Sequence, residues 1–260
     1  MEKAVQMSSL ADRQQPVLGV LGGLGPLASA RFLLSIYSRH ASSYLEQELP
    51  AVILDSNPRF PNRTNAFLRG ETEELLYLTQ AGIRRLCEAK ATKVLICCFT
   101  LHYLLPQIAP ALRTQIISLP HVALAEVIRI DRPALMLCTT GTRQLRVFET
   151  DDLWSDASNQ IVWPNSIVQA EIQDLIYQLK AGLNPESARV TIADLCKQHG
   201  VDCCIAGCTE FHLLTTYDRN KIRTAHFPQV IDALEVIAAN TVSFSGYLQH
   251  SAEVSKKRRW

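Results

Sequence analysis

Short apolar segments alternate along the chain with longer segments of helical periodicity, and this alternation restricts the fold more than any other feature. The apolar segments are rich in Val, Ile and Leu, which is typical of strands that are buried on both faces. They are residues 16–22, 51–57, 93–98, 115–119, 134–140, 160–164 and 201–207. Helical patterns begin near Leu27 and cover about 71–89, 103–113, 142–150, 166–181 and 185–199, and a loop follows residue 57. The alternation predicts an α/β fold with parallel sheets flanked by helices.

A chain of 260 residues with 47% hydrophobic residues is long enough for two modest domains or one large domain. Its 26 basic and 25 acidic residues give a net charge of +1, which creates no field that would attract nucleic acid or an anionic membrane. No apolar run approaches the roughly 20 residues that span a bilayer, and the N-terminus lacks the apolar stretch of a secretory signal. We therefore expect a cytoplasmic protein with small-molecule partners.

Residues 93–102 and 201–212 resemble each other. Each segment runs from a strand into a cysteine, a nearby threonine and a histidine four residues after the cysteine, as in Cys98 with His102 and Cys208 with His212. Open parallel sheets bind ligands at the carboxyl ends of their strands. Two similar α/β halves would therefore each bring one thiol to a ligand site, and a duplicated fold follows.

The chain has eight cysteines, which in a cytoplasmic protein indicate buried thiols, metal ligands or catalysis before disulfides. The nearest match to a zinc motif is Cys204 and Cys208 with His212, but no second ligand pair completes it, so we expect no metal. We interpret six cysteines as small buried hydrophobic residues: Cys87, Cys97, Cys138, Cys196, Cys203 and Cys204.

Cys98 and Cys208 differ from the other cysteines because each ends a strand where the sequence turns polar. Backbone N–H groups, hydroxyls and imidazoles at such a place lower a cysteine pKa from its usual value of about 8.5. Inverting a stereocentre needs a base on one face and an acid on the other, which two such thiols would supply.

The glycine turn at residues 22–26 follows a strand and precedes a helix, so its N–H groups are placed to hold a carboxylate or a phosphate. A rival interpretation is a dinucleotide fingerprint at Gly23-x-Gly25-x-x-Ala28 with Asp55, although the spacing to Asp55 is longer than usual.

Two cations are candidates for binding a carboxylate. The guanidinium of Arg63 suits two-point recognition of a carboxylate, and its alternative is a surface arginine. Lys180 lies near the end of a predicted helix, where it would equally complement the helix dipole.

Five motifs together resemble the aspartate/glutamate racemase superfamily, and specifically its aspartate racemase branch, which is cofactor-independent and uses two cysteines. The motifs are GGLGP at 22–26, NPRFPNRT at 57–64, ICCFTLH at 96–102, TTGT at 139–142 and AGCTE at 206–210. The resemblance implies two α/β domains related by a pseudo-twofold axis, an active site between them, no PLP or metal, and a homodimer. On this chain we expect a first domain at 16–115 plus 222–250, a second at 116–221, and flexible tails at 1–15 and 251–260.

The resemblance also implies roles for individual residues. Cys98 and Cys208 match the catalytic cysteines, and Arg63 and Lys180 match the pair that binds the side-chain carboxylate of the substrate. Further residues match positions that line or support the site: Gly23, Phe99, Thr100, Thr140 and Thr209 toward the substrate, and His102 and Glu210 behind the thiols. The implied activity is the interconversion of L- and D-aspartate, or of glutamate, by thiol and thiolate proton transfer.

One position departs from the family pattern. Phe99 stands where the family usually has an Asn that contacts the substrate, and Cys97 replaces the preceding Pro. Two alternatives therefore stay open: another dicarboxylate isomerase on the same scaffold, similar to maleate isomerase, and a catalytically silent small-molecule-binding homologue.

Overall fold

The computed structural model describes residues 16–215 and 227–241. The tails predicted at 1–15 and 251–260 lie outside the described residues, as do residues 222–226 and 242–250 of the predicted segment 222–250. In the described part of the chain, no helix has the length and hydropathy needed to cross a membrane.

The first half of the chain forms a four-stranded parallel sheet with the order β2-β1-β3-β4. Its strands are β1 (Val17–Gly22), β2 (Ala51–Ser56), β3 (Lys93–Ile96) and β4 (Ile116–Ile117). Its helices are α1 (Pro26–His40), η1 (Glu46–Glu48), α2 (Arg63–Arg69), α3 (Glu73–Glu88), η2 (Thr100–Gln107) and α4 (Pro110–Arg113).

The second half forms another four-stranded parallel sheet, with the order β6-β5-β7-β8. Its strands are β5 (Ala134–Cys138), β6 (Ile161–Val162), β7 (Cys203–Gly207) and β8 (Gln229–Ile231). Its helices are α5 (Leu119–Ile130), α6 (Thr140–Gln144), η3 (Val147–Thr150), α7 (Trp154–Ala157), η4 (Ser158–Gln160), α8 (Ser166–Lys180), α9 (Pro185–Gln198), η5 (Thr209–Phe211) and α11 (Ala233–Asn240).

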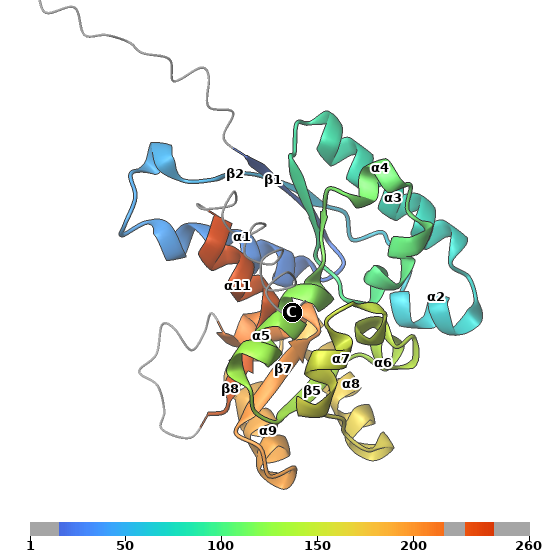
Figure 1. Ribbon diagram of the computed structural model, residues 1–260, viewed down its shortest axis with the longest axis vertical. Helices are drawn as coiled ribbons and strands as arrows, with labels where there is room; N and C mark the ends of the chain where they lie inside the picture. Colours follow the sequence, from blue (N-terminus) through green and yellow to red (C-terminus); the bar gives the residue numbers. More distant parts are fainter. Residues whose placement is uncertain (1–15, 216–226, 242–260) are drawn as a thin grey trace, which may run out of the picture.

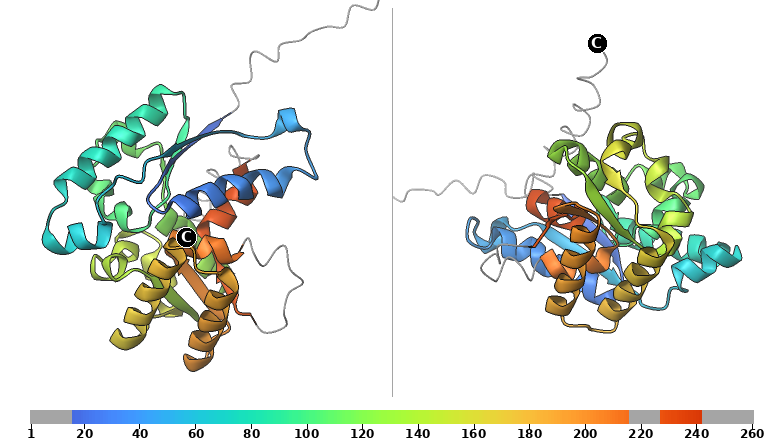
Figure 2. Two further views of the ribbon diagram at one scale, coloured as in Figure 1. Left: turned by 180° about the vertical axis from the view of Figure 1, so that it is seen from behind. Right: turned by 90° about the horizontal axis from the view of Figure 1, so that it is seen from below.

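The two sheets repeat one topology, because the order of the second sheet is that of the first when the count restarts at β5. Figure 1 shows the first half above the second, and Figure 2 shows the same arrangement from behind and from below. The prediction of an α/β fold with parallel sheets flanked by helices is confirmed. The repeat also places the two candidate cysteines at equivalent points: Cys98 follows β3, and Cys208 follows β7.

The core is arranged by the alternation of side chains along each strand. In β3, Val94 and Ile96 pack on the side of α3, whereas Leu95 packs into a cluster that includes Phe32 of α1. That cluster continues into the second sheet through Met136 and other residues of β5, β7, α5 and α11. The two halves therefore share one buried cluster, which fixes the carboxyl ends of β3 and β7 relative to each other.

The strand pairing differs from the predicted domain bounds at two short strands. Strand β4 pairs with β3, so residues 116–117 belong to the first sheet and not to the second domain. Strand β8 pairs with β7, so residues 229–231 belong to the second sheet and not to the first domain. After β8 the chain returns to the first half, because α11 lies beside α1 (Figure 1). Residues 115–119 were predicted as a strand, but the sequence pattern does not tell which sheet a strand joins, and residues 229–231 were not predicted as a strand.

The helix predictions differ in several places. Residues 103–113 form η2 and α4 instead of one helix, because Pro106 has no N–H to donate and Pro110 starts a new helix. A helix, α2, occupies part of the segment that was expected to be a loop, with Asn62 as its N-cap. Helix α5, which is capped by Ser118, was not expected.

Candidate active site

A small pocket lies between the two halves, at the carboxyl ends of β3 and β7. Both halves line it: Leu24, Asn62, Arg63, Thr64, Cys98, Phe99 and Thr100 come from the first, and Thr139, Gln173, Tyr177, Lys180, Cys208, Thr209 and Glu210 from the second. Its volume is about 20 Å³, room for roughly one water molecule. A ligand of amino-acid size therefore requires the walls to move apart.

Cys98 follows β3, separated from it by Cys97, and has 9% of its surface exposed. Its carbonyl oxygen accepts a hydrogen bond from Nδ1 of His102 at 2.9 Å, and Nε2 of His102 accepts one from the N–H of Leu119 at 3.1 Å. Burial lowers the pKa of His102, so the ring is neutral with its proton on Nδ1. His102 therefore supports the backbone of Cys98 and does not line the pocket.

Cys208 lies directly after β7 and is also buried. Its thiol donates a hydrogen bond to Oε2 of Glu210 at 2.8 Å. Burial and the negative charge of Glu210 raise the pKa of Cys208 well above its ordinary value, although the positive charge of Lys180 opposes them. Cys208 is therefore held as a thiol beside a base that is able to accept its proton.

The two cations face the same pocket. Nζ of Lys180 lies 3.5 Å from Oε1 of Glu210. Burial lowers the pKa of Lys180, but the negative charge of Glu210 is the largest of the causes that raise it, so the net shift is upward and the ammonium is retained. The guanidinium of Arg63 donates to the carbonyl oxygens of Pro61, at 3.1 Å, and of Leu24. Arg63 thereby ties α2 to the glycine turn.

The glycine turn approaches the second half closely. A Cβ on Gly25 would lie 2.2 Å from Oε1 of Glu210, so the absence of a side chain makes room for this carboxylate. Gly23 has φ +79°, and a Cβ there would lie 2.4 Å from the backbone of Asn57. Gly23 therefore shapes the turn and does not line the pocket. Asp55, the candidate ribose ligand of the rival interpretation, accepts a hydrogen bond from Arg85 at 2.7 Å and does not line the pocket either.

Three threonine hydroxyls join the two halves, and two of them, those of Thr100 and Thr139, belong to residues that line the pocket. Thr100 bonds Thr139 at 3.2 Å and Thr142 at 2.9 Å, and Thr139 bonds Thr142 at 2.9 Å. Thr139 takes the place that was expected for Thr140, whose N–H donates to Gln173 and which lines a separate groove. Thr209 donates to the carbonyl oxygen of Cys97 at 3.4 Å.

Phe99 both lines the pocket and belongs to the core. Its ring stacks on Phe148 of the second half, with centroids 5.4 Å apart, and 3% of its surface is exposed. The residue that departs from the family pattern is therefore held by packing between the two halves.

Several lining residues were not predicted, chiefly Asn62, Gln173 and Tyr177. Asn62 donates to the hydroxyl of Tyr177 at 3.1 Å, which links α2 to α8 across the pocket mouth. A signal existed in the sequence, because Gln173, Tyr177 and Lys180 are four and three residues apart and share one face of α8.

In the described part of the chain, one group of side chains has metal-ligand geometry, namely His121, Asp151 and Asp152, whose candidate ligand atoms lie within 4.8 Å of one another. Nδ1 of His121 bonds Asp151 at 3.0 Å, and this contact raises the pKa of His121. None of the three lines the pocket.

Comparison with known proteins gives a consistent result. A family model described as Asp/Glu/Hydantoin racemase matches residues 21–241. The chain is similar to the Picrophilus torridus aspartate racemase, with 21% identity, a TM-score of 0.73, and coverage of 89% of this chain and 94% of that one. For an aspartate racemase homologue from Pyrococcus horikoshii OT3 the identity is 17%, the TM-score 0.62 and the coverage 89% and 99%.

Solved structures of other racemases are similar as well. For the glutamate racemase of Francisella tularensis in complex with D-glutamate, the identity is 13%, the TM-score 0.54 and the coverage 92% of this chain and 82% of that one. At these identities the likeness shows a common fold.

Proposed function

Because the chain belongs to the Asp/Glu/hydantoin racemase family, we propose that it interconverts L- and D-aspartate and that Cys98 and Cys208 carry the proton. The observation that carries this proposal is the pocket between the halves, in which one thiol follows the third strand of each sheet. Two thiols from opposite sides suit a reaction that removes a proton from one face of a carbon and returns one to the other.

In the proposed reaction, one sulfur acts as a thiolate and takes the α-proton of the amino acid, and the electron pair stays on the α-carbon. The opposite thiol then gives its proton to the other face of that carbon. One S–H bond forms and one breaks, so no oxidant or reductant is needed. In the direction in which Cys208 is the base, Cys208 must start as a thiolate. Oε2 of Glu210, 2.8 Å from its sulfur, is then the acceptor for the thiol proton.

The charges of the pocket support a dicarboxylate as substrate. Arg63 and Lys180 both line it, and each would bind the side-chain carboxylate of aspartate. The threonine hydroxyls would hold the α-carboxylate as negative charge develops on it. If the walls that move apart to admit the substrate close around it again, water is excluded, which strengthens these interactions.

The test replaces each thiol separately. Cys98→Ala and Cys208→Ala should both lose racemisation of aspartate, measured by chiral chromatography, while Cys87→Ala, whose thiol does not line the pocket, should keep it. Incorporation of solvent deuterium at the α-carbon checks that a proton is transferred. Substantial racemisation by either pocket variant would contradict the two-thiol mechanism. Binding of aspartate by the wild type without deuterium incorporation would favour a catalytically silent binding protein.

Three expectations from the sequence stay predictions. A panel of L-amino acids tests aspartate against glutamate and larger substrates. Light scattering on the purified protein tests the homodimer. Cell fractionation tests the cytoplasmic location.

A further inference from the structure

Each catalytic-cysteine candidate is followed four residues later by a buried histidine that does not line the pocket. His102 bonds the N–H of Leu119, the first residue of α5, just after β4. His212 bonds the carboxylate of Asp232, the N-cap of α11, just after β8. In both halves the histidine therefore connects the cysteine loop, after the third strand, to the junction between the fourth strand and its helix.

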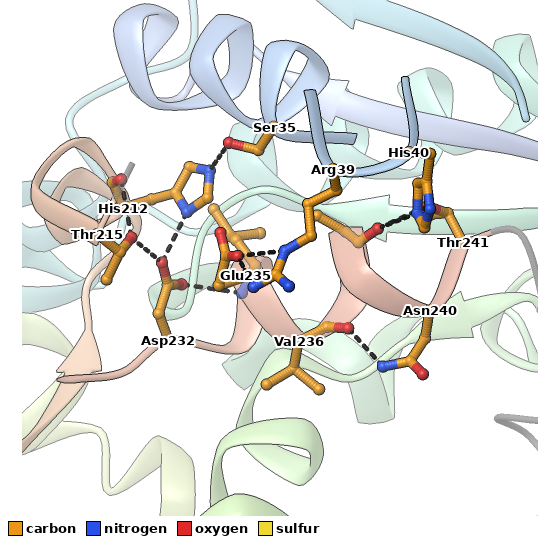
Figure 3. A network of polar contacts seen from close by, with 12 residues as sticks. Ser35, Arg39, His40, His212, Thr215, Asp232, Glu235, Val236, Asn240 and Thr241 are labelled. Carbon is orange, nitrogen blue, oxygen red and sulfur yellow. Dashed lines mark hydrogen bonds and ion pairs between the residues drawn. The ribbon is translucent and has the colours of Figure 1, made fainter. Parts of the chain in front are cut away.

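In the second half, side chains make the connection between the cysteine loop and the start of α11. Figure 3 shows His212 between Ser35 and Asp232: Nδ1 donates to Oδ2 of Asp232 at 2.6 Å, and Nε2 and Oγ of Ser35 are 2.9 Å apart. Thr215 donates to the same carboxylate oxygen at 2.6 Å, and Oδ1 of Asp232 accepts from the N–H of Leu234 at 3.0 Å.

The order serine, histidine, aspartate resembles a hydrolytic triad, but the site is closed. Ser35 is 2% exposed, His212 0% and Asp232 4%, so no substrate reaches the serine oxygen. The network therefore acts within the protein and not as a nucleophile.

Asp232 makes the network rigid. Burial raises the pKa of this carboxyl, but His212 and Thr215 outweigh it and the net shift is downward, so the group is ionised. A buried charge is expensive unless its partners are fixed around it. Any movement of the His212 ring would leave this charge poorly compensated.

The network also reaches the pocket through α1. Helix α1 starts directly after Gly25, which abuts Glu210, and it carries Ser35 further along. Its place is fixed by α11 as well, because Arg39 pairs with Glu235 (Figure 3). Two points of contact, at Glu210 and at His212, thus set the loop that carries Cys208 against α1.

We propose that His212 is a positioning residue for Cys208, with Ser35 and Asp232 fixing its ring, and that His102 has the same role for Cys98. The consequence for racemisation rests on the proposed function, whereas the positioning itself does not. Displacing a catalytic thiol by about 1 Å lowers the rate on the order of 100-fold. Residues that fix the position of the thiol therefore affect catalysis even though they touch no substrate.

The first experiment measures thiol reactivity and needs no substrate. Cys98 and Cys208 are alkylated with iodoacetamide, and their rates are followed separately by mass spectrometry of the peptides. His212→Leu should release the loop and speed alkylation of Cys208 about tenfold. Exposing the thiol to water and losing its contact with Glu210 both favour the thiolate, which is the form that reacts. Cys98 should change less than about twofold, and His102→Leu should give the opposite pattern.

Milder variants keep the test decisive if His212→Leu does not fold. His212→Asn retains an N–H donor toward Asp232 and should restore most of the protection. Ser35→Ala removes one neutral hydrogen bond and should speed alkylation of Cys208 about threefold. His199→Asn, at the end of α9, is the matched control and should change neither thiol. Equal changes at both thiols, or none at Cys208, would overturn the proposal.

The second experiment measures the primary isotope effect with α-deuterated L- and D-aspartate. Each thiol has its own proton-transfer step, so a misplaced Cys208 makes its step limiting. His212→Leu should then raise the isotope effect for one enantiomer only, and His102→Leu for the other. Equal effects for both enantiomers contradict positioning. If the wild type does not racemise aspartate, the proposed function fails, and the alkylation rates still decide the inference.

Discussion

The thiol of Cys208 donates to Oε2 of Glu210 at 2.8 Å, while the other carboxylate oxygen lies 3.5 Å from Nζ of Lys180. A proton acceptor and a cation therefore both stand behind one of the two thiols. We expect this arrangement to control how readily Cys208 becomes a thiolate.

Glu210→Gln should lower the pKa of Cys208, because the negative charge of Glu210 is one of the causes that raise it. The rate of alkylation at Cys208, followed against pH, should have its midpoint at a lower pH than in the wild type. The control is Glu171→Gln, which makes the same change of charge on the exposed side of α8. An unchanged midpoint would show that Glu210 does not govern this thiol.

Gly25→Ala should abolish most of the activity with little loss of stability. The new Cβ would lie 2.2 Å from Oε1 of Glu210, and the flexible carboxylate would move aside and leave Cys208. Gly70→Ala should behave in the opposite way: nothing lies within 4 Å of its Cβ, but φ is +73°, which costs roughly 1–2 kcal/mol. Racemisation and urea unfolding of both variants check the contrast, and full activity of Gly25→Ala would contradict it.

Lys180→Gln should raise the KM for aspartate about tenfold or more, since it removes a charge-assisted contact to the side-chain carboxylate. The kcat should fall too, because Lys180 lowers the pKa of Cys208 and its loss raises that pKa further. Lys197→Gln, on the exposed side of α9, is the matched control. Steady-state kinetics with both variants test this role in substrate binding, and an unaltered KM would show that Lys180 does not bind the substrate.

The sequence was sufficient for the repeated α/β architecture because strands buried on both faces have a strong apolar pattern. It also placed Cys98 and Cys208 correctly at strand ends, since the change from apolar to polar residues occurs there. Strand β8 was missed because it has only two apolar residues, Val230 and Ile231, and so shows no apolar run. The contact between Ser35 and His212 joins residues 177 positions apart, and no local pattern encodes such a pairing.

Motif matching was accurate to the segment and less so to the residue. The TTGT motif contains Thr139, Thr140 and Thr142, but the turn into α6 directs Thr139 and Thr142 toward Thr100 and leaves Thr140 on the other side. The direction of a side chain at a helix start depends on the cap, and here Thr139 is the N-cap. Such a choice is decided by backbone geometry and not by residue type.

Phe99→Asn, which introduces the residue usual in the family, should destabilise the protein by about 3 kcal/mol. It removes a buried ring from its stack on Phe148 and places an amide in the core. Tyr77→Asn, at a position on α3 that is 68% exposed, should change the free energy of unfolding by less than about 0.5 kcal/mol. Urea unfolding of the two variants tests this, and equal stability would show that Phe99 does not hold the halves together.

The protein should lose stability as the pH rises above 9. Burial raises the pKa of Cys138 from 9.0 to about 12, and burial is also the main cause that raises the pKa of Cys203 to about 11. Above pH 9.0 the unfolded chain releases these thiol protons while the folded protein keeps them, so proton release favours unfolding. The free energy of unfolding should fall by on the order of 1 kcal/mol per pH unit for each thiol, until the pH passes its folded pKa.

Two variants of β5 separate the effect of the buried thiols on stability from other causes of alkaline unfolding. Cys138→Ala removes a titrating group, so its stability, measured by urea unfolding from pH 7 to pH 11, should fall less steeply with pH than that of the wild type. Leu137→Val makes a cavity beside it without removing a proton, and it should shift the whole curve down without changing its slope. If Cys138→Ala leaves the slope of stability against pH unchanged, then the thiol of Cys138 ionises in the folded protein as it does in the unfolded chain, and its burial does not raise its pKa.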